Sequence, residues 1–246
     1  MHASPLKNSR VFCLLACTCL CLCLLSGQSL ADGSSIDKVY HPYVQPLERE
    51  LEYRSRYQRD GDERLDGQQR HLLGYGQSFS DRVFGEIYLD ARKDSADSFS
   101  IDAIEVEAKI QLTEQGEYDN DWGLLFELER DKNRGIWEAS STLIALHEWS
   151  NWIATANVGL IYEWGSTIPS EWETSFSTQL RYRYRQSIEP SIEMYLAEDT
   201  KAIGPVLSGT LRLAGNRKLR WESGVILGVD SKTPDTSLKF TVEYEF

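Results

Sequence analysis

Residues Trp152–Trp164 read WIATANVGLIYEW, and this stretch decides the fold because its side chains alternate in character. Every second position, from Trp152 to Trp164, carries Trp, Ala, Val, Leu or Tyr, and most of the positions between them carry polar or small residues. The next stretch, Trp172–Tyr184, reads WETSFSTQLRYRY and alternates in the same way. Successive side chains of a β-strand point to opposite faces, so both stretches predict strands with one apolar and one polar face.

The same period-two pattern recurs along the chain after Asp32 and predicts twelve strands separated by polar turns, with no internal repeat or linker. The first strand could also be a charged helix, since Leu47 and Leu51 are four residues apart. A strand is favoured there, because closing the sheet needs a twelfth member. The predicted strands are Leu47–Arg59, Arg70–Phe79, Arg82–Arg92, Ser100–Leu112, Asp121–Arg130, Gly135–Leu146, Trp152–Trp164, Glu171–Arg185, Pro190–Ala197, Pro205–Leu213, Leu219–Val229 and Thr236–Phe246.

The first residues predict a secretory signal peptide that occupies residues 1–31. Lys7 and Arg10 precede an apolar run from Val11 to Leu25, and Ser29-Leu30-Ala31 supplies the small residues of a cleavage site. The run is short for a transmembrane helix, which disfavours an uncleaved anchor. All five cysteines lie within this run, so the mature chain is expected to contain no disulfide bond.

The composition excludes several classes of protein. The chain has 246 residues, with 26 Lys+Arg against 38 Asp+Glu, and its formal net charge is −12. Nucleic acid is therefore not an expected partner, because a phosphate backbone binds basic surfaces. A mean hydropathy of −0.42 is too polar for a bundle of membrane helices. An aromatic content of 11% is too high for a disordered chain.

The placement of tryptophan favours a membrane barrel over a soluble β-sandwich or lipocalin-like binding protein of the periplasm. All seven tryptophans fall at or near predicted strand ends, where they form two aromatic girdles around an apolar band. A soluble core would place its large aromatic side chains in mid-strand, and small residues such as Ala154 and Ala156 would leave holes in it. The girdle residues are Trp122, Trp137, Trp149, Trp152, Trp164, Trp172 and Trp221.

The chain ends with LKFTVEYEF, Leu238–Phe246, which resembles the terminal strand of bacterial outer-membrane β-barrels. Its middle, including Gln111–Tyr118 and Trp122–Glu127, is similar to proteobacterial envelope barrels of a porin-like family. The resemblance implies a closed antiparallel barrel of twelve strands, with ten possible, in the outer membrane. It also implies contact with the bilayer, with lipopolysaccharide and with the outer-membrane assembly machinery. In this family the machinery reads the terminal segment, here Phe240, Val242, Tyr244 and Phe246.

The polar faces of the predicted strands carry a cluster of charged residues toward the periplasmic half, if both termini are periplasmic. In an open lumen this cluster would be a basic constriction that selects small anions. In a closed lumen it would be a plug held by salt bridges. Both interpretations stay open, so the predicted function is a passive channel for small solutes or a structural envelope protein. The cluster comprises Arg181, Arg183, Arg185, Arg212, Arg220, Glu193, Glu222 and Glu243.

A lipid-modifying hydrolase of the outer membrane is the competing function. Only His71 falls at the predicted outer rim, and no serine lies within two residues of it. The sequence has no G-x-S-x-G, H-E-x-x-H, P-loop or paired Cys/His motif, so no catalytic residue, metal ligand or cofactor is assigned. The predicted domains are the signal peptide 1–31, a periplasmic N-terminal arm Asp32–Pro46 that would be a tail or fold into the lumen, and the barrel 47–246.

Overall fold

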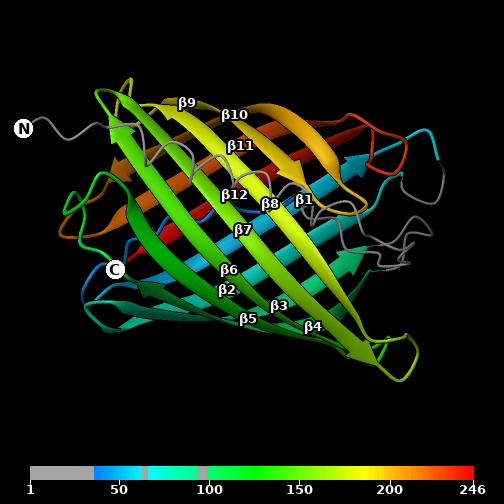
Figure 1. Cartoon of the computed structure of the whole chain (residues 1–246). Helices are drawn as coiled ribbons and strands as arrows, with labels where there is room; N and C mark the ends of the chain where they lie inside the picture. Colours follow the sequence, from blue (N-terminus) through cyan, green and yellow to red (C-terminus); the bar gives the residue numbers. More distant parts are fainter. Residues whose placement is uncertain (1–35, 63–65, 94–98) are drawn as a thin grey trace, which may run out of the picture. The chain divides into compact units, whose positions relative to one another are not determined.

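The computed structural model describes residues 36–62, 66–93 and 99–246, so the predicted signal peptide and the start of the arm lie outside the described residues. Twelve antiparallel strands pair in sequence order, and β1 pairs with β12 to close a barrel (Figure 1). Within the described ranges, no helix has the length and hydropathy needed to cross a bilayer. The strands are β1 (Arg49–Arg59), β2 (Gln69–Ser80), β3 (Val83–Lys93), β4 (Phe99–Gln111), β5 (Asp121–Asp131), β6 (Ile136–Trp149), β7 (Trp152–Gly165), β8 (Glu171–Tyr182), β9 (Glu189–Leu196), β10 (Lys201–Arg212), β11 (Lys218–Gly228) and β12 (Thr236–Glu245).

The predicted fold class and the number of strands are confirmed. β1 pairs along Glu50–Arg59 with β12 and along Arg49–Tyr57 with β2, so the helical alternative for this segment is wrong. The sandwich is excluded as well, because all twelve strands belong to one closed sheet. Closure gives every strand two partners and leaves no open edge, which is the condition for a sheet to lie in lipid.

Three predicted boundaries differ by three or four residues, since β6 continues to Trp149, β10 begins at Lys201, and the eighth strand is shorter than its alternation suggests. The alternation continues to Arg185, whereas β8 ends at Tyr182. Beyond it, the backbone N–H of Arg183 donates to the carbonyl of Asn151, and Arg185 pairs with Ile188 across a tight turn that leads into β9. Arg185 therefore lies in a turn at the rim where β1 begins and β12 ends, which we call the C-terminal rim.

The outer surface of the barrel is apolar along the middle of its strands. Val158 and Leu180 are 54% and 40% exposed, whereas their neighbours Asn157 and Gln179 are 4% and 2% exposed. The apolar parity therefore faces outward and the polar parity faces the lumen, the reverse of a water-soluble barrel. An outer belt of this kind requires a surrounding hydrocarbon layer.

Aromatic side chains gather at both rims of the belt. At the C-terminal rim the ring of Trp152 packs against that of Tyr182, with centroids 4.9 Å apart. At the opposite rim Trp137 stacks on Trp164, with centroids 6.1 Å apart. Strand positions place Trp122, Trp149, Trp152 and Trp221 near the first rim and Trp137, Trp164 and Trp172 near the second.

Arginine at the centre of this belt is expected to destabilise the barrel. Val158→Arg should lower the free energy of unfolding by about 2–4 kcal/mol, because a charged group then lies near the bilayer midplane. Val158→Leu keeps the surface apolar and should change stability little. Urea unfolding of both variants in phospholipid vesicles measures the difference. An equal, small loss in both would mean that Val158 does not face lipid.

Candidate functional site

The lumen of the barrel is occupied by the N-terminal arm, of which residues 36–46 are described. Its apolar side chains Ile36, Val39, Tyr40 and Val44 are all buried. They reach inward-facing residues of strands on several sides of the barrel, so the arm runs inside the lumen. Two small apolar clusters result, one of Ile36, Val39, Tyr195, Ala202, Val206 and Ile226, the other of Tyr40, Leu125 and Ile144.

Polar side chains of the wall hold the backbone of the arm. The N–H of Tyr40 donates to Asn157 Oδ1 at 2.8 Å, and Asn157 Nδ2 donates back to the carbonyl of Tyr40 at 3.0 Å. The N–H of Val44 donates to Gln111 Oε1 at 2.7 Å. Among the described residues, no backbone–backbone hydrogen bond joins residues 36–44 to a strand. Side-chain amides thus replace strand pairing, and the arm is not part of the sheet.

Arg54 of β1 is the centre of the charge network beneath the arm. Its side chain is 2% exposed. Three carboxylates and two tyrosine hydroxyls surround the guanidinium, so a buried cation is fully compensated. These partners are Asp37 at 3.2 Å, Glu52, Glu107 at 3.0 Å, Tyr40 at 2.9 Å and Tyr88 at 2.7 Å.

Two lysines complete the attachment of the arm. Lys239 Nζ of β12 donates to the carbonyl of Asp37 at 2.9 Å and pairs with Glu193 at 2.8 Å. Lys38 of the arm pairs with Glu52 at 2.5 Å and with Glu243 at 2.6 Å. The arm therefore supplies both a cation and an anion, and its ion pairs link it to the neighbouring strands β1 and β12.

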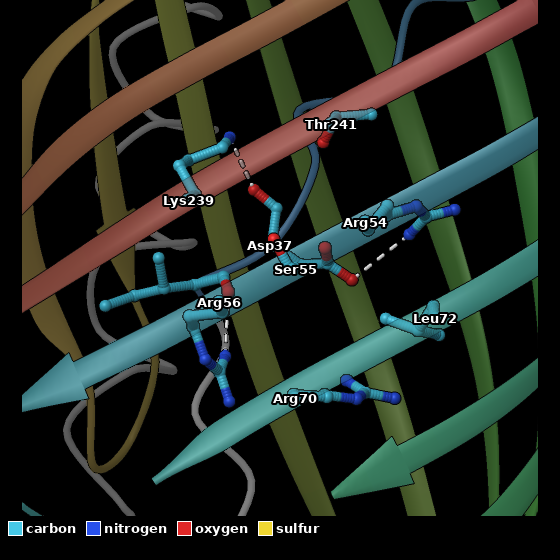
Figure 2. Close-up of a pocket in the computed structure, with 9 residues that line it drawn as sticks. Asp37, Arg54, Ser55, Arg56, Arg70, Leu72, Lys239 and Thr241 are labelled. Carbon is cyan, nitrogen blue, oxygen red and sulfur yellow. Dashed lines mark hydrogen bonds and ion pairs between the residues drawn. The ribbon is translucent and has the colours of Figure 1, made fainter. Parts of the chain in front are cut away.

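A small pocket, partly open to solvent, lies beside Asp37. Figure 2 shows Asp37 between Lys239 and Arg54, with Arg56 and Arg70 on the adjacent side. Arg56 Nη1 donates to the carbonyl of Ile36 at 2.8 Å. The remaining space is small beside a lumen that already holds a segment of chain. The lining residues are Ile36, Asp37, Arg54, Ser55, Arg56, Arg70, Leu72, Lys239 and Thr241.

The strand register aligns carboxylates across the wall. Like charges opposite one another on neighbouring strands repel, so these rows need compensating cations. Arg70 supplies one, at 2.9 Å from Asp90 and 2.8 Å from Glu129, and Arg92 contacts the same two acids. One row runs through Glu105, Glu129, Glu138, Glu163 and Glu171, and another through Glu86, Glu107 and Glu127.

The arginines singled out in the sequence do not converge. Arg181 pairs with Glu189 at 3.2 Å, whereas Arg183 lies on the C-terminal rim and pairs with Glu148 at 2.6 Å. Arg185 and Arg212 are exposed. These four arginines of the predicted cluster thus lie apart, and no basic ring forms from them.

The remaining members of the predicted cluster lie in the lumen but take other partners. Arg220 pairs with Glu243 at 3.4 Å and with Glu245 at 2.6 Å. Glu193 and Glu222 both meet Lys239, each at 2.8 Å, instead of an arginine of β8.

Sequence reasoning missed Arg54, Lys239 and the role of Tyr40. The first two had a visible signal, since each lies on the polar parity of its strand between outward residues such as Tyr53 and Phe240. Tyr40 had none, because residues in an irregular arm carry no periodicity.

The terminal residues of the predicted assembly signal face outward on β12, apart from the last, which follows the strand. Tyr244 stacks on Phe246 with ring centroids 5.7 Å apart. The N–H of Phe246 donates to the carbonyl of Arg49 at 2.9 Å, which fastens the chain end to β1. Phe240 and Val242 lie further along the same face and pair in register with Ser55 and Tyr53 of β1.

His71, the histidine at the predicted outer rim, has neighbours at both ring nitrogens. Ser55 of β1 lies directly opposite it in the register. However, Tyr53 Oη lies 2.8 Å from His71 Nδ1, and Gln69 Oε1 lies 3.2 Å from His71 Nε2. Both ring nitrogens thus lie within hydrogen-bonding distance of a neighbouring side chain.

Comparison with solved structures shows this fold in bacterial outer-membrane channels. The COG4313 outer membrane channel from Pseudomonas putida F1 matches with a TM-score of 0.54 and 12% identity, over 87% of this chain and 100% of that chain. The NanC porin matches with a TM-score of 0.51 and 8% identity, over 80% and 98% of the two chains. The KdgM porin matches with a TM-score of 0.50 and 14% identity, over 80% and 99%. No protein-family model and no curated protein matches the sequence. In fold, the chain is a closed twelve-stranded β-barrel similar to those of these outer-membrane porins and channels.

Proposed function

We propose that the protein is an outer-membrane channel for small solutes and that its own N-terminal arm holds it closed. The observation that carries this proposal is the attachment of the arm, which fills a polar lumen through side-chain contacts alone. A segment that shares no strand pairing with the wall can leave without breaking the barrel. A purely structural barrel has no need of a removable segment.

The wall favours cations and neutral solutes over anions once the arm has left. Rows of carboxylates cross the lumen, and the basic residues among them are already paired. Withdrawal of the arm also removes Lys38, which now neutralises Glu52 and Glu243. A pore lined by carboxylates attracts cations and repels anions. The anion-selective alternative needs the arginines of the predicted cluster to converge, and they lie apart.

The proposal includes the partners of an outer-membrane barrel and assigns no catalytic role. The apolar belt contacts lipid, with lipopolysaccharide at the outer leaflet, and the terminal strand is the segment that the assembly machinery would read. Both termini of the barrel domain then face the periplasm. The engaged ring nitrogens of His71 argue against lipid hydrolysis.

Single-channel recording in planar bilayers tests the proposal. Asn157→Ala removes both hydrogen bonds to the backbone of Tyr40 and should raise the open probability about tenfold, since each bond contributes roughly 0.5–1.5 kcal/mol. Under a salt gradient the reversal potential should show cation preference. Asn133→Ala, in the exposed turn after β5, is the matched control and should leave the currents unchanged. The absence of unitary current in both wild type and Asn157→Ala would favour the structural role.

A further inference from the structure

A group of carboxylates meets in the lumen near the C-terminal rim. Carboxylate oxygens of Glu50, Glu52 and Glu86 all lie within 4.8 Å of one another, and the same holds for Glu48, Glu50 and Glu245. Glu50 belongs to both groups and therefore lies at their centre. Glu50, Glu52 and Glu86 are each less than 10% exposed, at 4%, 1% and 7%.

The glycine at position 76 allows the side chains of Glu50 and Glu86 to approach each other. Gly76 of β2 pairs in register with Glu50 of β1 on one side and with Glu86 of β3 on the other. A Cβ atom at Gly76 would lie 2.8 Å from Cγ of Glu86. The side chain of Glu86 thus occupies the space above the glycine and crosses β2 toward Glu50. The sequence did not predict this carboxylate group, because its members come from β1 and β3 and meet across β2.

The carboxylate of Glu50 is buried, and the charges of Lys38 and Arg220 act on it only from beyond ion-pair distance. Among the residues that the structure describes, no hydrogen bond or ion pair reaches it. Glu86 accepts one hydrogen bond, from the hydroxyl of Tyr88 at 2.5 Å, and has no basic partner in the described ranges. Two buried carboxylates without a cation are costly, and the cost falls when a positive ion joins them.

The basic groups around this cluster pair with Glu52 at its edge and with acids outside it. Lys38 pairs with Glu52 and Glu243, and Arg54 pairs with Glu52. Lys218 pairs with Glu245, and Arg220 pairs with Glu243 and Glu245. Positive charge therefore reaches the edges of the cluster, whereas its centre at Glu50 and Glu86 stays negative.

We propose that Glu50, Glu52 and Glu86 bind a divalent metal cation, Ca²⁺. Hard cations take carboxylate oxygens, and Ca²⁺ accepts the irregular geometry of three side chains from two strands more readily than Mg²⁺ does. Oxygens bound to one Ca²⁺ at about 2.4 Å lie at most about 4.8 Å apart, which matches the observed spread. The site belongs to the wall of the barrel and does not depend on conduction, so its test is separate from that of the proposed function.

Calcium titration calorimetry on the folded, detergent-solubilised protein at neutral pH tests the site. We expect one saturable site with a dissociation constant of about 0.1–1 mM, the range of extracellular calcium modules. Glu50→Gln should weaken binding about tenfold or more, and Glu86→Gln should do the same. Retained heat-modifiable mobility on gels shows that each variant is folded.

The control variant lies in a second carboxylate group at the opposite rim, formed by Glu163, Glu171 and Glu173. Glu173→Gln should leave the calorimetric affinity unchanged. The proposal is overturned if wild type binds no Ca²⁺. That result is expected if the carboxyl groups of Glu50 and Glu86 are protonated and need no cation. It is also overturned if both Gln variants at the lumenal cluster bind as wild type does, or if only Glu173→Gln weakens binding.

Discussion

Replacing Arg54 by methionine is expected to lower the free energy of unfolding of the barrel by about 3–5 kcal/mol, the largest stability loss that the lumen predicts. The guanidinium is buried and neutralises Asp37, Glu52 and Glu107 together. Methionine keeps much of the volume and removes the charge, so three carboxylates lose their common partner in a confined space. Urea unfolding in phospholipid vesicles, followed by tryptophan fluorescence, measures the loss.

An exposed arginine provides the control for this measurement. Arg82 pairs with Glu114 at 2.7 Å, and the two side chains are 50% and 61% exposed. Arg82→Met should therefore cost less than about 1 kcal/mol. Adding Glu107→Gln to Arg54→Met should recover part of the stability, because one uncompensated charge disappears. Equal losses at Arg54 and Arg82 would refute the view that the lumen is held together by buried ion pairs.

The sequence predicted the fold well because the barrel is specified by a local rule. Each strand separates an apolar face from a polar one, and Val158 beside Asn157 shows the division at a single step. The tryptophans near the strand ends indicated in addition that the apolar face contacts a lipid bilayer. Such information lies within a dozen neighbouring residues and can be read without knowing which strands pair.

Contacts in the lumen could not be read in this way, because they depend on register and closure. The sequence placed Arg181 and Glu193 in one charged cluster, but the register pairs Arg181 with Ser191 and places Glu193 opposite Gln179. Glu193 instead meets Lys239 of β12, three strands away around the barrel. Pairs that span the lumen follow from how the sheet closes, and no local pattern records that.

The arm shows the same limit. Pro42 and Pro46 correctly indicated that it forms no regular strand. Its position was left open between a periplasmic tail and a segment inside the lumen. The hydrogen bonds from Asn157 and Gln111 to the backbone of the arm show that it lies inside the lumen. In the sequence, however, each is a single polar residue at an inward-facing strand position, as is ordinary for the lining of a lumen.

Tethering the arm to the wall is expected to abolish opening. His41 Nδ1 lies 3.2 Å from Thr155 Oγ1 of β7. All native cysteines lie within the predicted signal peptide, so His41→Cys with Thr155→Cys introduces the only thiols of the mature chain. In the Asn157→Ala background, where the arm is loosened, oxidation of this pair to a disulfide should close the channel. Reduction should restore the current, and His41→Cys alone should respond to neither treatment.

The most direct test of the account is therefore the current of this tethered variant in one bilayer before and after addition of a reductant. A lumen closed by its own arm predicts no unitary openings while the disulfide is intact and cation-selective openings after reduction. The same current in both states, with the disulfide verified by mass spectrometry, would contradict the claim that the arm gates the barrel.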